Sequence, residues 1–137
     1  MSSPLRAEAL VAASVLVGIE QRYRTVFENS PDAQVIFDLH TQAPLEFNAA
    51  ALRLLQTGAE ELRRAPLDNH LAPGDRPAFM AQASQVLLLG RHDFECQMRR
   101  QDGSIIDVQV RAAAVELEGR SCVHAVLRDV TATNRAA

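Results

Sequence analysis

Residues 94–131 read FECQMRRQDGSIIDVQVRAAAVELEGRSCVHAVLRDVT, and this stretch decides the fold. Apolar and polar residues alternate on both sides of Asp102-Gly103, as in strands that have one buried and one wet face. An Asp-Gly pair between two such runs predicts a hairpin turn, because glycine adopts a positive φ without steric strain. A third apolar run, Val123 to Val130, follows the turn at Glu118-Gly119-Arg120. The stretch therefore predicts three consecutive antiparallel strands.

Such a meander cannot bury its apolar face alone, so the first 90 residues must supply the rest of the sheet and a cover for it. Short strands are predicted at Val35–Leu39 and Leu45–Phe47, the second as an edge strand. Helices are expected between these strands and residue 90. The order of a helix, two strands, several helices and three strands predicts an α+β domain. Its sheet has five antiparallel strands, with helices over one face.

Single residues mark where the intervening helices begin and end. Asn48 is a good N-cap for a helix that Gly58 ends, and either Asp75 or Pro77 opens a longer helix that runs through Leu89 and is closed by Gly90. For Asn48 and Asp75 we expect a capping role first and contact with a ligand second. Between these two helices, Glu60–Arg64 predicts a further helical turn.

The composition restricts the class of protein. A chain of 137 residues with 47% hydrophobic and 23% charged residues is typical of one globular domain. The net charge of −3 argues against a nucleic-acid partner. All 14 basic residues are arginine, so Schiff-base lysine chemistry and a Walker lysine are excluded. Two cysteines make no disulfide framework and indicate a reducing compartment, so we expect a cytoplasmic location.

The N-terminal segment contains an apolar run from Ala9 to Ile19, which is too short to span a membrane and has no signal-peptide layout around it. We therefore expect no membrane segment in this chain. Residues 1–27 instead show the a/d spacing of a heptad repeat, which predicts an amphipathic helix. The strict 3.5-residue period favours a homodimer formed through this helix over a helix packed on its own sheet, and both remain open. The seam consists of Leu5, Ala9, Ala12, Leu16, Ile19, Tyr23 and Val26.

Five short motifs follow one another along the chain, and together they carry a resemblance to a known family. They are ENSPDA at 28–33, FNAA at 47–50, LAPGDR at 71–76, RQDGS at 100–104 and RDVT at 128–131. In this order and spacing, over roughly residues 23–131, the chain resembles a PAS domain, a small bacterial sensory fold. The resemblance implies the strand order 2-1-5-4-3 and a pocket between sheet and helices. It divides the chain into the N-terminal helix (1–27), the PAS domain (28–131) and the start of an output linker (132–137).

The strand order that the resemblance implies separates the two cysteines. Cys96 falls on the third strand and Cys122 on the fifth, with the fourth strand between them. Two strand spacings are about 9–10 Å, whereas a disulfide needs Cα atoms within about 7 Å. We therefore expect no disulfide, and we expect Cys96 to be a small inward-facing core residue.

The pocket that the resemblance implies has no assigned cofactor. Haem-binding PAS domains need a histidine on the helix before the third strand, here residues 75–89, and that helix has none. A photoreactive flavin needs a cysteine after Arg64, where none occurs, and the four scattered histidines form no metal site. We expect neither haem nor photoreactive flavin, and a redox flavin bound without the cysteine, a small apolar or amphipathic ligand and a filled core remain as alternatives. The expected lining residues are Val35, Phe37, Asn48, Leu55, Leu67, Phe79, Val86, Met98, Val108, Val110 and Val126.

The end of the chain points to signalling output. In PAS domains the segment that resembles Asp129–Thr131 passes a signal to the next helix, which Thr131 can cap. We expect an effector domain in a larger protein, first a sensor histidine kinase and second a cyclic-dinucleotide cyclase or phosphodiesterase. A ligand-free dimerisation domain is a further alternative. A small enzyme is disfavoured, because no nucleophile–base pair appears and the strand carboxylates Asp38, Glu46 and Asp107 are predicted to point outward.

Overall fold

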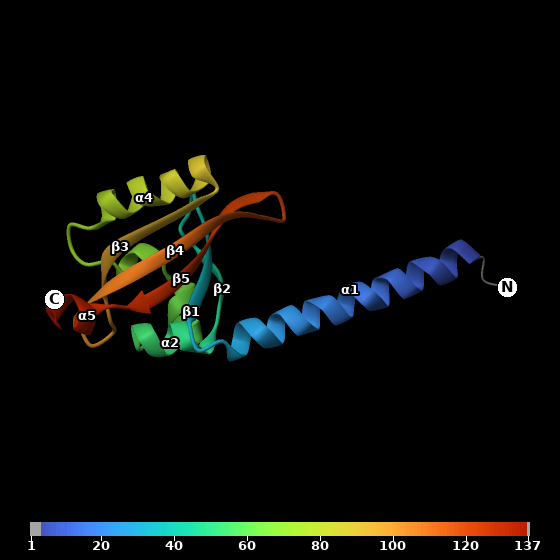
Figure 1. Cartoon of the computed structure of the whole chain (residues 1–137), viewed down its shortest axis with the longest axis horizontal. Helices are drawn as coiled ribbons and strands as arrows, with labels where there is room; N and C mark the ends of the chain where they lie inside the picture. The colour runs from blue at the N-terminus through green and yellow to red at the C-terminus, as the bar shows by residue number, and fades with distance from the viewer. Residues whose placement is uncertain (1–3, 137) are drawn as a thin grey trace.

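A computed structural model describes residues 4–136 and shows a five-stranded antiparallel sheet with helices over one face (Figure 1). The strands lie in the order β2-β1-β5-β4-β3, so the predicted fold class and strand order are confirmed. Of the predicted N-terminal helix and output linker, residues 1–3 and 137 lie outside the described residues. The elements are α1 (Pro4–Asn29), β1 (Ala33–Asp38), β2 (Pro44–Phe47), α2 (Ala49–Leu55), α3 (Ala59–Arg64), the 3₁₀ helix η1 (Leu67–His70), α4 (Arg76–Leu89), β3 (Arg91–Arg99), β4 (Ile105–Leu117), β5 (Arg120–Asp129) and α5 (Thr131–Ala136).

The two faces of the sheet differ in what covers them. In the central strand β5, Val123, Ala125 and Leu127 belong to the buried cluster that the strands share with α2, α3, η1 and α4. Side chains alternate along a strand, so Val126 lies on the opposite, outer face and is only half-buried. The prediction that Val126 lines the space between sheet and helices is therefore wrong.

Strand β4 has 13 residues and is the longest of the five strands. It continues past Arg111 through an alanine-rich segment that ends at Leu117, and Ala112 to Leu117 pair with Ala125 to Arg120 of β5. Alanine has a low intrinsic strand propensity, but pairing with a neighbouring strand overrides such a preference. The long β4–β5 hairpin extends beyond the rest of the sheet (Figure 1).

Two predicted helix boundaries need correction. Helix α2 ends at Leu55 because Gln56 takes the left-handed conformation with φ 56°, so Gly58 does not end this helix but precedes α3. The side chain of Asp75 makes no capping bond to α4, although its backbone carbonyl accepts from the N–H of Phe79 at 2.8 Å. Its carboxylate instead accepts a hydrogen bond of 3.0 Å from the backbone N–H of Gln97 on the edge strand β3.

The turn between β3 and β4 has the predicted glycine geometry. Gly103 has φ +88°, and its N–H donates to the carbonyl of Arg100 at 2.9 Å. A Cβ atom at Gly103 would meet no other atom within 4 Å, so a larger residue would strain only the backbone.

We expect Gly103→Val to lower the free energy of unfolding by about 1–2 kcal/mol, because a β-branched residue avoids positive φ. Gly103→Asn should cost less, since asparagine tolerates this conformation better. Thermal melts of both variants beside wild type measure the effect. Equal melting temperatures for wild type and Gly103→Val would show that the turn relaxes to another type.

Helix α1 projects away from the sheet as an isolated rod (Figure 1). Phe27 is its one buried side chain between residues 5 and 29, and the rest of this range is exposed apart from Gly18. The alternative in which α1 packs along its own sheet is therefore not what the structure shows. The contact at Phe27 fixes only the last turns of the helix to the domain.

Candidate functional site

The space between sheet and helices, where the pocket was expected, is occupied by tightly buried side chains. Of the eleven predicted lining residues, nine lie in the buried cluster, each with 4% or less of its surface exposed. The described surface cavities lie elsewhere and share at most one residue each with this set. The nine residues are Val35, Phe37, Leu55, Leu67, Phe79, Val86, Met98, Val108 and Val110.

Asn48 is fully buried and uses its whole side chain within the domain. Its Oδ1 accepts from the backbone N–H groups of Gln34 and Ala51, each at 3.0 Å, which confirms the predicted N-cap of α2. Its Nδ2 donates to the carbonyls of Phe27 and Asp32, each at 2.9 Å. Asn48 thus joins the end of α1, the start of β1 and the start of α2, and it has no donor or acceptor to spare for a ligand.

Gln42 is a buried polar residue that sequence reasoning missed. It stands in the turn between β1 and β2 with φ 60°, and only 7% of its surface is exposed. Its Nε2 donates to the sulfur of Met80 on α4, and its buried Oε1 has no partner. A glutamine in a turn is normally solvated, so no local signal distinguished it. The Oε1 of Gln42 is one of three buried side-chain atoms without a hydrogen-bond partner among the described residues, beside Thr57 Oγ1 and Arg100 Nε.

A row of aromatic rings connects the sheet to α4. The Phe79 ring lies 5.9 Å from the rings of both Phe37 and Phe94, measured between centroids. Beside it, Cys96 lines a cavity of about 100 Å³ at the edge between α4 and β3. That volume is well below the 300–1,000 Å³ of typical ligand pockets. Burial, and secondarily the charge of Asp75, raises the pKa of Cys96 to about 12, so its thiol is protonated and unreactive at neutral pH.

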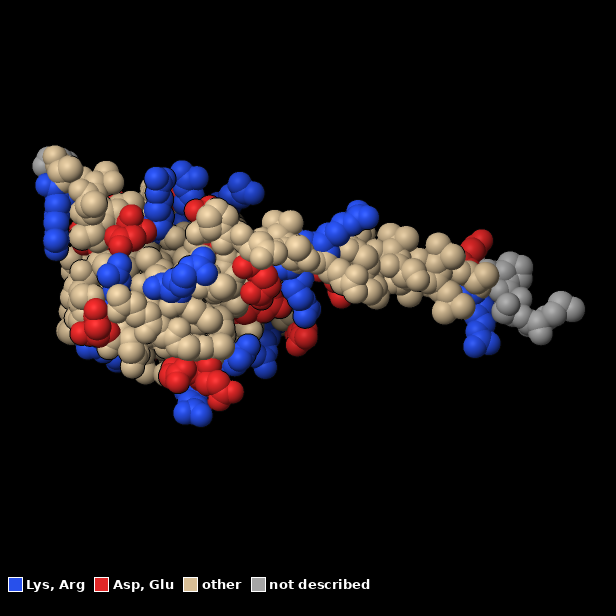
Figure 2. All heavy atoms as spheres, turned by 90° about the horizontal axis from the view of Figure 1, so that it is seen from below, with Lys and Arg blue, Asp and Glu red and all other residues tan. Residues whose placement is uncertain are grey.

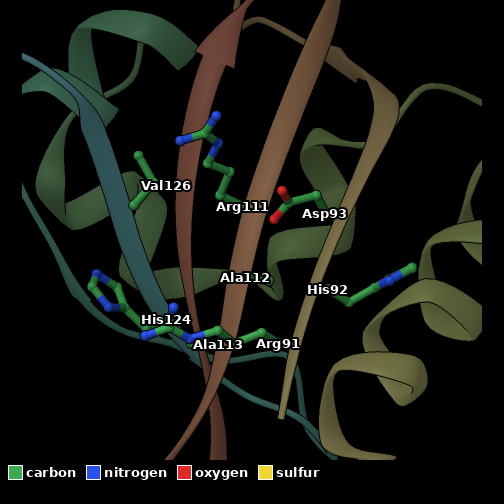
Figure 3. A pocket seen from close by; sticks show the side chains of 8 residues that line it. All are labelled: Arg91, His92, Asp93, Arg111, Ala112, Ala113, His124 and Val126. Atoms are coloured by element: carbon green, nitrogen blue, oxygen red, sulfur yellow. The ribbon is translucent and has the colours of Figure 1, made fainter. Parts of the chain in front are cut away.

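The outer face of the sheet carries a larger groove of about 590 Å³ (Figure 3). The residues that line it include Arg91, Asp93, Arg111, His124 and Val126. The ring of His124 hydrogen-bonds the side chain of Gln34 at 2.8 Å and lies 6.4 Å from the ring of Phe27.

Burial lowers the pKa of His124, although the charge of Glu46 opposes the shift, so its ring is neutral at pH 7. In Figure 3, His92 points away from this groove, toward α4, where it binds the side chain of Gln82. The two histidines therefore do not converge on one site.

The junction between β5 and α5 is held by a set of short polar contacts. Asp129 forms an ion pair of 3.1 Å with Arg100 and accepts from the N–H of Thr131 at 3.0 Å. Burial alone would raise the pKa of Asp129, but the bonds from Thr131 and Arg100 outweigh it and lower the pKa. Thr131 does not cap α5 as predicted; its hydroxyl oxygen accepts from the backbone N–H of Asp107 on β4, at 2.8 Å.

The exposed surface of α1 is largely apolar. Among the seam residues, Leu5, Leu16, Ile19, Tyr23 and Val26 each expose more than half of their surface. Ala9 and Ala12 of the seam are exposed as well. Figure 2 shows an uncharged surface along the middle of the projecting helix. A continuous apolar surface of this kind is unusual for a monomeric protein and is typical of protein interaction sites.

Asp38 lies on the outer face of the sheet, as predicted, since it pairs with Cys122 and alternates with the core residue Phe37, but it is buried there rather than exposed. Its carboxylate accepts from the N–H groups of Thr41 and His40, and these bonds lower its pKa. A carboxylate that is held ionised in a turn has a structural role and is not suited to act as a general acid.

Neither a metal site nor a membrane-spanning helix occurs in the part of the chain that the structure describes. Within residues 4–136, no three histidine, cysteine or carboxylate residues cluster closely enough to hold a metal ion. No helix in this range has the length and apolar character needed to cross a membrane. Both cysteines are free, and β4 separates the strands that carry them.

Comparisons with known proteins support the fold. Residues 31–132 match the family model of the PAS domain. The structure is similar to the PAS domain of an HTR-like protein from Haloarcula marismortui, with 26% identity and a TM-score of 0.72, covering 86% of this chain and 97% of that one. It is also similar to a PAS domain from Colwellia psychrerythraea, with 21% identity, a TM-score of 0.75 and coverage of 83% and 98%. A PAS domain from a two-component sensor histidine kinase shows 18% identity, a TM-score of 0.70 and coverage of 82% and 98%. A search of curated proteins found no match.

Proposed function

The chain belongs to the PAS domain family, and from this premise we propose that it is the sensory and dimerising module of a cytoplasmic bacterial signalling protein. The first candidate for the parent protein is a sensor histidine kinase, and a similar PAS structure carries that description. A cyclic-dinucleotide cyclase or phosphodiesterase is the second candidate. The domain itself is proposed to carry no catalytic activity, and its output leaves through Asp129 and Thr131 toward an effector domain.

The exposed apolar surface of helix α1 is the observation that supports a dimer. A compact protein of 15.0 kDa is expected to expose about 7,000 Å². This chain exposes 8821 Å². The excess is larger than the roughly 800 Å² that one partner contributes to a standard interface. With 26 residues, α1 is about 39 Å long and can pair over several heptads with a second copy.

Whether the module also senses a small molecule depends on the core. The packed interior supports a ligand-free dimerisation domain, because nine of the expected lining residues already fill it. The unpaired Oε1 of Gln42 supports the sensing alternative. A small apolar ligand with one N–H or O–H group could satisfy this oxygen if α4 moved outward at Met80.

Native mass spectrometry of the purified chain tests this function, with a visible absorption spectrum of the same sample. We expect the mass of two chains, no Soret band and no flavin band that bleaches under blue light. An added small mass on the dimer would support sensing, and the bare dimer mass would support the ligand-free alternative. A bare monomer, or either absorption band, would contradict the proposal as stated.

A further inference from the structure

The Asp107 carboxylate, on the outer face of β4, binds two neighbouring elements at once. Its Oδ1 accepts from the side-chain amide of Gln97 on β3 at 3.1 Å. Its Oδ2 accepts from the side-chain amide of Asn134 on α5 at 3.2 Å. Asn134 also lies 3.5 Å from the carboxylate of Glu95, which is a longer contact. The two oxygens of Asp107 thus hold the edge strand on one side and the output helix on the other.

Gln97 is held in turn by the loop that precedes α4. Its backbone N–H donates to the Asp75 carboxylate at 3.0 Å, and its carbonyl accepts from the N–H of Ala72 at 3.1 Å. Asp75 is the residue immediately before α4, whose buried side chains include Phe79. A continuous row of contacts therefore runs from the start of the helix that covers the core, through Gln97 and Asp107, to α5.

Helix α5 depends on such contacts for its direction. It has six residues and no buried side chain, so neither its length nor apolar packing holds it in place. Within it, the N–H of Asn134 donates to the carbonyl of Val130 at 2.8 Å, and the side chain of Asn134 makes the contact to β4 one turn after the junction. This contact fixes the angle of α5 rather than its starting point.

We infer that Asp75, Gln97, Asp107 and Asn134 form a hydrogen-bonded relay, through the backbone and the side chain of Gln97, that sets the direction of α5 and couples it to the position of α4. Gln97 and Asn134 are positioning residues in this relay. The inference rests on the proposed function, since it gives the route by which a change under α4 would reach the output. An outward shift of α4 would withdraw Asp75 from Gln97, loosen the edge of β3 and release α5 from Asp107.

Amide hydrogen exchange, measured by NMR on the whole chain, tests the relay. We expect Asn134→Ala to raise the exchange rates of the α5 amides by about three- to tenfold, as for the loss of one hydrogen bond. Alanine favours helix more than asparagine does, so helix propensity would act in the opposite direction. Thr133→Ala, an exposed neighbour on α5, is the matched control and should change the rates by less than about twofold.

Two variants at the other end measure the coupling. Asp75→Ala removes the hydrogen bond between the Asp75 carboxylate and the backbone N–H of Gln97 on β3. Gln97→Leu removes the side-chain bond to Asp107 but keeps the backbone bond to Asp75. Both should accelerate α5 exchange, and each combined with Asn134→Ala should add little beyond the larger single effect. Amides of β4 that stay protected show that the sheet remains folded in each variant.

The relay is refuted if Asn134→Ala leaves the α5 rates unchanged. It is equally refuted if Asp75→Ala and Gln97→Leu both leave them unchanged, because α5 is then held locally without coupling to α4. Neither result depends on the oligomeric state, so a failed relay would leave the dimer intact as a proposal. If the wild type were monomeric, the proposed function would be contradicted, but the exchange rates of the α5 amides would still test the relay.

Discussion

Replacing both Leu16 and Ile19 with glutamate should convert a dimer into a monomer whose sheet remains folded. These side chains expose 62% and 54% of their surface in the single chain, so their substitution removes no contact within the domain. Each would contribute about 1.5–3 kcal/mol if buried against a second copy. In a symmetric pair of helices the double variant places four carboxylates in one interface, where they repel one another and must lose water.

Sedimentation velocity at tens of micromolar, with circular dichroism as the folding control, measures this effect. The chain offers a matched control in Leu88→Glu combined with Leu89→Glu, at the end of α4, where the leucines expose 78% and 62% of their surface. The control adds the same charge outside the seam and should remain dimeric. A wild type that is already monomeric, or a double variant at 16 and 19 that still dimerises, would contradict the role of the seam.

Replacing Asn48 with alanine should lower the free energy of unfolding by about 3 kcal/mol or more. The substitution removes the side-chain partner of the Gln34 N–H and of the Phe27 and Asp32 carbonyls, while the Ala51 N–H keeps its second bond to the backbone carbonyl of residue 48. Each group left unsatisfied costs about 1–3 kcal/mol unless water reaches it. Asn48→Asp keeps the acceptor oxygens but loses both donors to the carbonyls of Phe27 and Asp32. We expect it to be destabilising as well, because a carboxylate would then face two carbonyl oxygens.

Urea unfolding followed by circular dichroism measures the change. Asn69→Ala provides the control, because the side chain of Asn69 is exposed and the substitution should change stability by less than about 0.5 kcal/mol. A loss below about 1 kcal/mol for Asn48→Ala would show that water replaces the amide in the core. Because Asn48 binds the carbonyl of Phe27, its loss should also free the base of α1 from the domain.

Local sequence patterns determined those parts of the protein that depend on neighbours along the chain. Period-2 alternation located the three C-terminal strands, the Asp102-Gly103 pair predicted a turn with positive φ, and Asn48 was correctly assigned as an N-cap. The heptad in residues 1–27 predicted a helix that α1 confirms over the described range. The strand order came from the resemblance of five motifs to a known family, since periodicity cannot specify which distant strands pair.

The tertiary structure alone decided which partner a side chain finds across the fold. Asp75 satisfies the edge of β3 rather than the helix it precedes, because Gln97 lies 22 positions further along the chain but adjacent in space. Val126 was assigned to the wrong face, since an apolar residue in an apolar run does not reveal its register. Gln42 is buried where Met80 of α4 and the backbone N–H of Leu67 in η1 both contact its turn. The direction of α1 also followed from contacts at its base, where Phe27 meets His124 and its carbonyl meets Asn48, and no periodicity within the helix encodes those contacts.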